Sequence, residues 1–109
     1  MNQINEFTLD TELRHLSLKH RINLAAILDV GDSWKVLASL IPKPDSQDGF
    51  LLTSANILTL EQQKYVHNGS PTQALLDYWG TSGRKRANLG LFIDLLAKCK
   101  LYRAADYIC

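Results

Sequence analysis

The stretch WGTSGRKR, residues 79–86, combines two glycines, two hydroxyls and three consecutive cations, which are residue types that can cradle a phosphate. A phosphate-binding P-loop needs four residues between its first glycine and a Gly-Lys pair, and a strand before it. Here only two residues separate Gly80 from Gly83. Arg84 also intervenes before Lys85, and the preceding residues have a helical pattern. The segment therefore lacks the spacing and the context of a P-loop.

Other reactive side chains lack the spacing of a catalytic or metal site. His15 and His20 are five residues apart, whereas a helical zinc pair needs a separation of four. The third histidine, His67, has no partner at metal spacing, and neither do Cys99 and Cys109. No Gly-x-Ser-x-Gly motif is present. We therefore expect no catalytic residue, no metal and no cofactor, and we interpret the cysteines as reduced thiols.

Charge is nearly balanced overall but unevenly distributed. Twelve Lys and Arg residues stand against eleven Asp and Glu, which argues against a dedicated nucleic-acid binder. Residues 1–63 carry five basic and eight acidic side chains, whereas residues 64–109 carry seven basic and three acidic. This asymmetry would allow contacts with opposite charges on two partners or on copies of the chain, although ordinary solvated faces also explain it.

Three interpretations of the cations Arg84, Lys85 and Arg86 stay open. They can form a solvated loop, contact a protein partner, or contact nucleic-acid phosphates. No aromatic side chain is interleaved with the triplet to stack on bases, and Trp79 falls on an apolar helical face. The sequence favours the solvated loop first, a protein partner second and nucleic acid third.

Helical periodicity along the chain predicts the elements that position these side chains. The predicted helices cover residues 16–29, 34–41, 54–65, 71–79, 89–99 and 101–108, with loop at 43–49. The predicted N-caps are Ser33, Thr53 or Ser54, Ser70 and Asn88. The positions predicted to be buried are Ile22, Leu24, Ala25, Ile27, Leu28, Trp34, Leu37, Ala38, Ile41, Leu75, Leu76, Trp79, Leu89, Phe92, Ile93, Leu96, Cys99, Leu101, Ala104, Ala105 and Ile108. We expect an all-α bundle forming a single domain over residues 1–109, with no signal peptide and no membrane insertion.

An ordered set of short segments resembles the death domain, and more narrowly the Tube and interleukin-1-receptor-associated-kinase family of Toll-pathway death domains. None of these segments is specific alone, but they follow the family's order over nearly the whole chain. They are TELR at 11–14, ILD followed by Trp34, the pair Ile41-Pro42, Asp77 to Trp79 followed by TSG, the pair Leu95-Leu96, and AAD at 104–106.

The resemblance implies a six-helix antiparallel bundle of the death-domain type that works by binding other death domains and has no catalytic activity. It implies a Toll/interleukin-1-receptor signalling adaptor or kinase that joins a myeloid-differentiation-type adaptor death domain to a Pelle-type kinase death domain. The expected place is the cytoplasm, with recruitment to the receptor complex at the plasma membrane. We also expect the chain to be the N-terminal fragment of a longer protein.

The residues suggest how such a domain would bind. Asp29 and Asp32 flank Gly31 at the first helix corner and are expected to form an acidic projection. A basic projection is expected from Arg84, Lys85 and Arg86 together with Lys98, Lys100 and Arg103. Opposite charges on one small domain would allow head-to-tail assembly. The alternatives are solubilising charges with mainly apolar contacts, and a nucleic-acid-binding helical domain that uses the basic loop 84–86.

Overall fold

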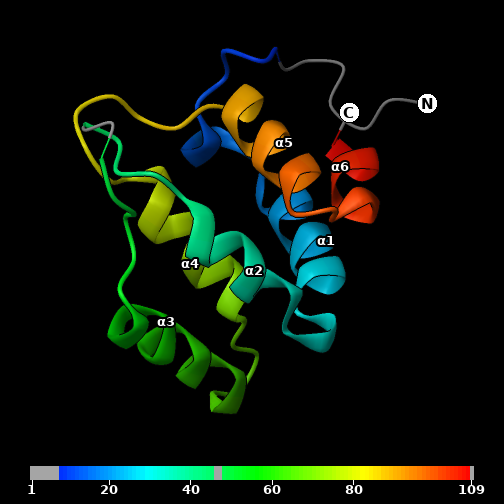
Figure 1. Cartoon of the computed structure of the whole chain (residues 1–109). Helices are drawn as coiled ribbons and strands as arrows, with labels where there is room; N and C mark the ends of the chain where they lie inside the picture. Colours follow the sequence, from blue (N-terminus) through cyan, green and yellow to red (C-terminus); the bar gives the residue numbers. More distant parts are fainter. Residues whose placement is uncertain (1–7, 46–47, 109) are drawn as a thin grey trace.

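The computed structural model describes residues 8–45 and 48–108, and the described residues form six α-helices and three 3-10 segments (Figure 1). The helices are α1 Leu18–Leu28, α2 Ser33–Leu40, α3 Ser54–Glu61, α4 Pro71–Gly80, α5 Leu89–Lys98 and α6 Tyr102–Ile108. The 3-10 segments are η1 Leu13–His15, η2 Val30–Asp32 and η3 Gln62–Tyr65. The predicted six-helix all-α architecture is confirmed.

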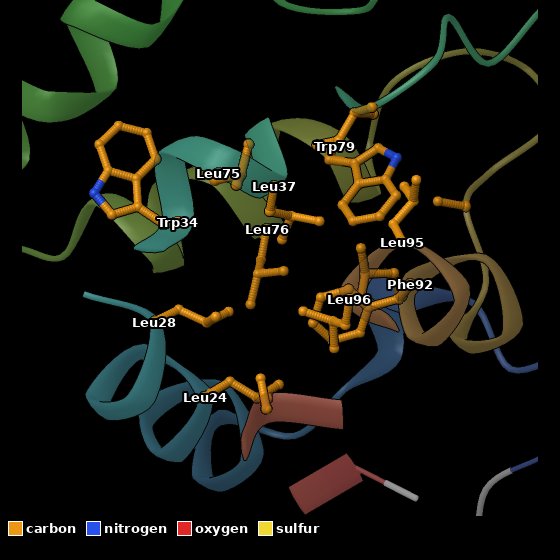
Figure 2. Close-up of a cluster of buried hydrophobic side chains, with 14 of the residues drawn as sticks. Leu24, Leu28, Trp34, Leu37, Leu75, Leu76, Trp79, Phe92, Leu95 and Leu96 are labelled. Atoms are coloured by element: carbon orange, nitrogen blue, oxygen red, sulfur yellow. The ribbon is translucent and has the colours of Figure 1, made fainter. Parts of the chain in front are cut away.

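The helices enclose one core. The helix α1 packs against α4 and α6, while α5 packs against α6 and α2 (Figure 1). The helix α3 lies at the edge of the bundle, where it contacts α2 and α4. Trp34, Leu37 and Ile41 are fully buried, and Trp79 meets Phe92 edge to face at a centroid distance of 5.8 Å (Figure 2). This arrangement leaves the connectors between helices on the outside.

Most helix starts follow from local sequence. The side chains of Thr53, Ser70 and Asn88 each accept a hydrogen bond from the backbone N–H three residues later, as predicted. Thr53 also forms a reciprocal capping box with Asn56, and Pro71 occupies the first position of α4, where its missing N–H costs nothing. These contacts satisfy backbone donors that would otherwise be unpaired.

The start of α2 differs from the prediction that Ser33 is its N-cap. Gly31 and Asp32 have φ angles of 61° and 57°, so two successive left-handed residues turn the chain directly into α2. Ser33 is already helical, and its hydroxyl donates to the Val30 carbonyl at 3.0 Å. No extended residue remains at this corner to act as a side-chain cap.

Five residues predicted to be buried lie nearer the surface. Ile22 is 48% exposed, and four others pack against the core while only partly buried: Ile27, Ile93, Cys99 and Leu101. On α5 the buried face includes Leu95 in place of Ile93, because α5 is covered on the side that faces α2 and α6. The segment before α3 pairs with the end of α2 through an isolated bridge between Pro42 and Phe50.

Candidate functional site

Asp29 does not project toward solvent as the sequence suggested. Its Oδ1 accepts hydrogen bonds from the Thr72 backbone N–H at 3.0 Å and from the Thr72 hydroxyl at 2.5 Å. Its Oδ2 accepts one from the Ser70 hydroxyl at 2.6 Å. A carboxylate is favourable at this place because it lies near the positive end of the α4 dipole. The structure corrects the expected role of Asp29, which joins the α1–α2 corner to the start of α4.

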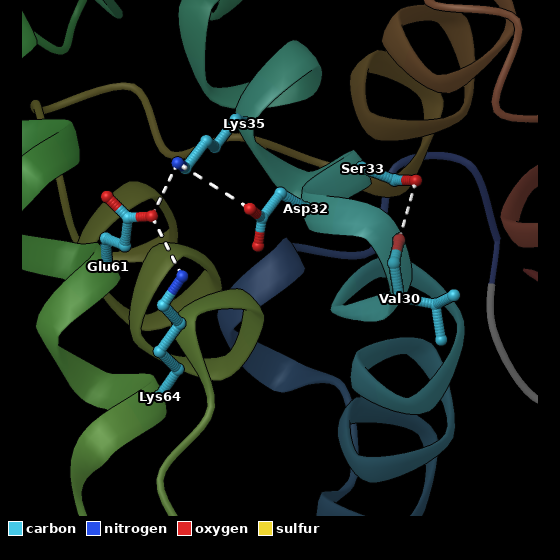
Figure 3. A network of polar contacts seen from close by, with 6 residues as sticks. All are labelled: Val30, Asp32, Ser33, Lys35, Glu61 and Lys64. Carbon is cyan, nitrogen blue, oxygen red and sulfur yellow. Dashed lines mark hydrogen bonds and ion pairs between the residues drawn. The ribbon is translucent and has the colours of Figure 1, made fainter.

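Asp32 stays on the surface but is only one member of a mixed charge cluster (Figure 3). Its side chain is 43% exposed and lies 3.7 Å from Lys35 Nζ. Lys35 in turn lies 2.6 Å from Glu61 Oε2, which also accepts from Lys64 Nζ at 3.0 Å. Hydrogen bonds from Lys35 and then Lys64 hold the pKa of Glu61 below its usual range. The negative charges of Asp32 and Glu61 are therefore balanced by neighbouring lysines.

The sequence could show only part of this cluster. Glu61 and Lys64 have helical i, i+3 spacing, which a sequence pattern can reveal. Lys35 and Glu61 are 26 residues apart and meet only because α2 packs against α3. The bridge between them was missed for that reason.

The predicted basic residues separate into two groups. Residues 84–86 lie in the connector that leads into α5, whereas Lys98 lies at the last turn of that helix and Lys100 and Arg103 follow it. The ten residues of α5 span roughly 15 Å. The structure therefore does not gather the six cations into one basic projection.

The second group lies beside the corner that was expected to be acidic. Lys100 and Arg103 line a recess of about 180 Å³ together with Val30 and Ser33. Lys100 has a φ of 60°, so the break in helical periodicity at this position is a left-handed turn between α5 and α6. Of the six cations predicted to form the basic projection, the three in the connector 84–86 lie apart from this corner.

The hydroxyls and glycines of WGTSGRKR shape a connector. The Thr81 hydroxyl donates to the Asp77 carbonyl at 2.8 Å, and the Ser82 hydroxyl donates to the Tyr78 carbonyl at 2.5 Å, so both close the end of α4. Gly83 has a φ of 75°, a left-handed conformation that favours glycine. Gly83 and the two hydroxyls are therefore engaged in turning the chain after α4.

The backbone of the connector is held by a distant carboxylate. Asp45 accepts hydrogen bonds from the Arg84 N–H at 3.2 Å and from the Lys85 N–H at 3.4 Å. The side chains of Arg84, Lys85 and Arg86 form no ion pair with any carboxylate of the described residues. Their charges remain available to a partner.

The potentially reactive side chains of His20 and Cys99 lie wholly or partly in the interior. His20 is buried, and its Nδ1 lies 2.9 Å from the Tyr107 hydroxyl, which also accepts from the Asn23 side-chain amide. Burial raises the pKa of the Cys99 thiol, which disfavours the nucleophilic thiolate.

Across residues 8–45 and 48–108, no group of three or more His, Cys, Asp or Glu side chains could hold a metal ion. In the same residues, no helix has the length and apolar character needed to cross a bilayer.

The model of the death-domain family matches residues 21–108. This chain belongs to the death-domain family. The match runs from within α1 to the end of α6, so it takes in residues of all six helices.

This death domain resembles two curated relatives. Protein Tube of Drosophila melanogaster is 27% identical over 124 residues, an alignment that covers 95% of this chain and 27% of that protein. Protein Tube of Drosophila virilis is 30% identical over 125 residues, covering 95% of this chain and 24% of that protein. The chain thus spans about a quarter of the length of these relatives.

A solved structure resembles this death domain in detail. A chain of the complex between the death domains of Pelle and Tube superposes with a TM-score of 0.85 at 27% sequence identity. The match covers 94% of this chain and 82% of the other. The resemblance to Tube-type death domains inferred from the sequence is confirmed.

Proposed function

We propose that this death domain is a non-catalytic adaptor module of Toll-type signalling that binds the death domain of a Pelle-type kinase. The observation that carries the proposal is the close similarity to a chain solved in the complex of the Pelle and Tube death domains. The identity to Protein Tube of two Drosophila species supports the same role.

A second partner follows from the adaptor role. An adaptor must hold two proteins, and we take the other to be the death domain of a myeloid-differentiation-type adaptor near the receptor. The domain would then act in the cytoplasm and join an oligomeric receptor complex at the plasma membrane. The chain would be one module of a longer protein, in keeping with the length of its relatives.

Two charged regions are available for these contacts. The connector 84–86 is the basic region, in which Arg84 and Lys85 are exposed. The α1–α2 corner is the other region, where Lys100 and Arg103 line a recess with Val30 and Ser33. Exposed charges of this kind steer encounter and select partners more than they add affinity.

Titration calorimetry against a Pelle-type kinase death domain tests the proposal. We expect binding that weakens when salt rises from low to physiological concentration, because exposed charge pairs are screened. A DNA duplex titrated under the same conditions serves as the comparison. Absence of kinase binding at both salt concentrations would remove the kinase as the partner, whereas salt-sensitive duplex binding alone would favour the nucleic-acid alternative.

A further inference from the structure

A recess opens beside the basic connector. It lies between residues 42–44, which follow α2, and residues 85–88, which lead into α5. Trp79 and Leu91 lie between these two walls, and the recess has a volume of about 290 Å³. Figure 2 shows Trp79 at the edge of the core, with its indole nitrogen directed away from Leu37 and Leu76. The recess is thus backed by the hydrophobic core.

Contacts beside the recess tie together the two chain segments that form its walls. A side chain on Gly83 would place its Cβ 2.5 Å from Pro44 Cγ, so the chain segments are in close contact there. One residue further along, the Asp45 carboxylate accepts from the backbone N–H groups of Arg84 and Lys85. A preformed recess spares a ligand the cost of ordering these loops.

The lining combines apolar surface with positive charge. Pro42, Pro44 and Leu91 supply apolar surface, while Lys43, Lys85 and Arg86 supply cations. Among the described residues that line the recess there is no carboxylate. Arg86 is half-buried, and partial burial strengthens its attraction for an anion. The recess therefore suits a ligand with an apolar centre and negative charges around it.

The volume of the recess and the burial of Trp79 restrict the class of ligand further. A recess of about 290 Å³ is near the lower limit for small-molecule sites and accommodates one large side chain. Stacking of a nucleic-acid base needs an exposed aromatic face, but Trp79 is only 1% exposed. These two properties favour a protein segment over a nucleotide.

We propose that this recess docks one bulky apolar side chain of an acidic linear segment in a partner protein, with Lys85 and Arg86 contacting the flanking carboxylates. The proposal rests on the proposed function in taking the partner to be a protein. It adds an apolar anchor to a surface whose charges alone would mainly steer the encounter with a partner. Buried apolar anchors carry more binding energy than charges at the rim of an interface.

The test is a nuclear magnetic resonance titration of the 109-residue chain with the peptide Gly-Ser-Asp-Glu-Leu-Asp-Glu-Ser-Gly. We expect a dissociation constant of about 1 mM or tighter, with the largest amide shifts at residues 42–44 and 85–91. A peptide with glycine in place of leucine, and one with Asn and Gln in place of the acids, should each bind at least about tenfold more weakly.

Matched variants of the domain separate the recess from general charge. Lys85→Glu should weaken peptide binding at least about tenfold, whereas Lys19→Glu makes the same charge change on α1 and should alter it less than about twofold. The amide spectrum of each variant reports whether it is folded. Equal binding of the glycine peptide, equal loss in both variants, or shifts away from the recess would overturn the proposal.

Three further outcomes distinguish this proposal from the proposed function and from binding of a nucleic acid. If the domain binds the kinase death domain by calorimetry but no peptide shifts appear at several millimolar, the recess proposal fails alone. If a thymidine oligonucleotide produces the shifts at residues 85–91 and the acidic peptide does not, the ligand class is wrong. If the peptide binds at the recess and the kinase death domain does not bind at all, the recess proposal stands and the kinase partner is removed.

Discussion

At the scale of single residues, the two aspartates of the α1–α2 corner show what sequence can and cannot predict. Their positions on either side of Gly31 were evident in the sequence, and both side chains were expected to project into solvent. The donors that engage Asp29 are Ser70 and Thr72, which are 41 and 43 residues away in sequence. No local pattern indicates such a contact, because it depends on how α1 packs against α4.

We predict that Asp29→Asn destabilises the domain by about 1–3 kcal/mol, because an amide replaces a carboxylate oxygen that accepts buried or half-buried donors. Asp32→Asn is the matched change, and asparagine tolerates the left-handed backbone there. It should cost less than about 1 kcal/mol, because the carboxylate is exposed and its ion pair is long. Urea unfolding of both variants measures the difference, and equal losses would refute the inward role of Asp29.

Glycines at two connectors provide a second comparison. Gly31 and Gly83 have φ angles of 61° and 75°, so alanine is strained at both. A Cβ at Gly31 would meet nothing within 4 Å, whereas at Gly83 it would lie 2.5 Å from Pro44. We predict that Gly31→Ala lowers the free energy of unfolding by about 1–2 kcal/mol. Gly83→Ala should lower it by at least about 1 kcal/mol more than Gly31→Ala does, and thermal unfolding measures both. Similar losses would show that Pro44 yields easily.

At the scale of elements, local signals predicted helix existence well. Caps such as Thr53, Ser70 and Asn88 act on backbone groups within three residues, so their chemistry is visible in the sequence. The start of α2 was placed one residue off, because the left-handed conformation of Asp32 belongs to the corner that reverses the chain between α1 and α2. Short-range chemistry is therefore readable, while backbone conformation at tertiary corners is not.

The attachment of α3 to the bundle should depend on pH. Among the described residues, α3 has no fully buried side chain, and Glu61 at its end is hydrogen-bonded to Lys35 of α2. Because Lys35 and then Lys64 lower the pKa of Glu61, the ionised form stabilises the fold. That contribution is present above the unfolded carboxyl pKa of about 4.3 and is lost as pH falls through the lower folded value.

We therefore predict that hydrogen exchange of the α3 amides accelerates as pH is lowered below about 4, after correction for intrinsic exchange rates. In Glu61→Gln the exchange should be faster at neutral pH and its corrected rate should depend less on acidification. Lys35→Gln should weaken the same attachment. An unchanged pH dependence in Glu61→Gln would show that another group controls α3.

At the scale of the whole molecule, composition predicted charge asymmetry but not its arrangement. The second half of the chain carries a net excess of cations, yet α5 places residues 84–86 and residues 98–103 at its opposite ends. Counting charges along the sequence cannot reveal this, because position on the surface depends on helix length and direction. The family resemblance could be predicted because its segments occur in order along the chain.

The separation of the cations leads to a prediction about assembly. We expect Arg84→Glu combined with Arg86→Glu to abolish binding to one of the two death-domain partners and to leave the other, because only one basic surface is reversed. Both side chains lack an ion pair within the described residues, so the variant should unfold at nearly the parent temperature. Calorimetry with each partner at two salt concentrations gives the answer. If both partners still bind with parental affinity, the connector 84–86 is a solvated loop and the contacts lie elsewhere on the bundle.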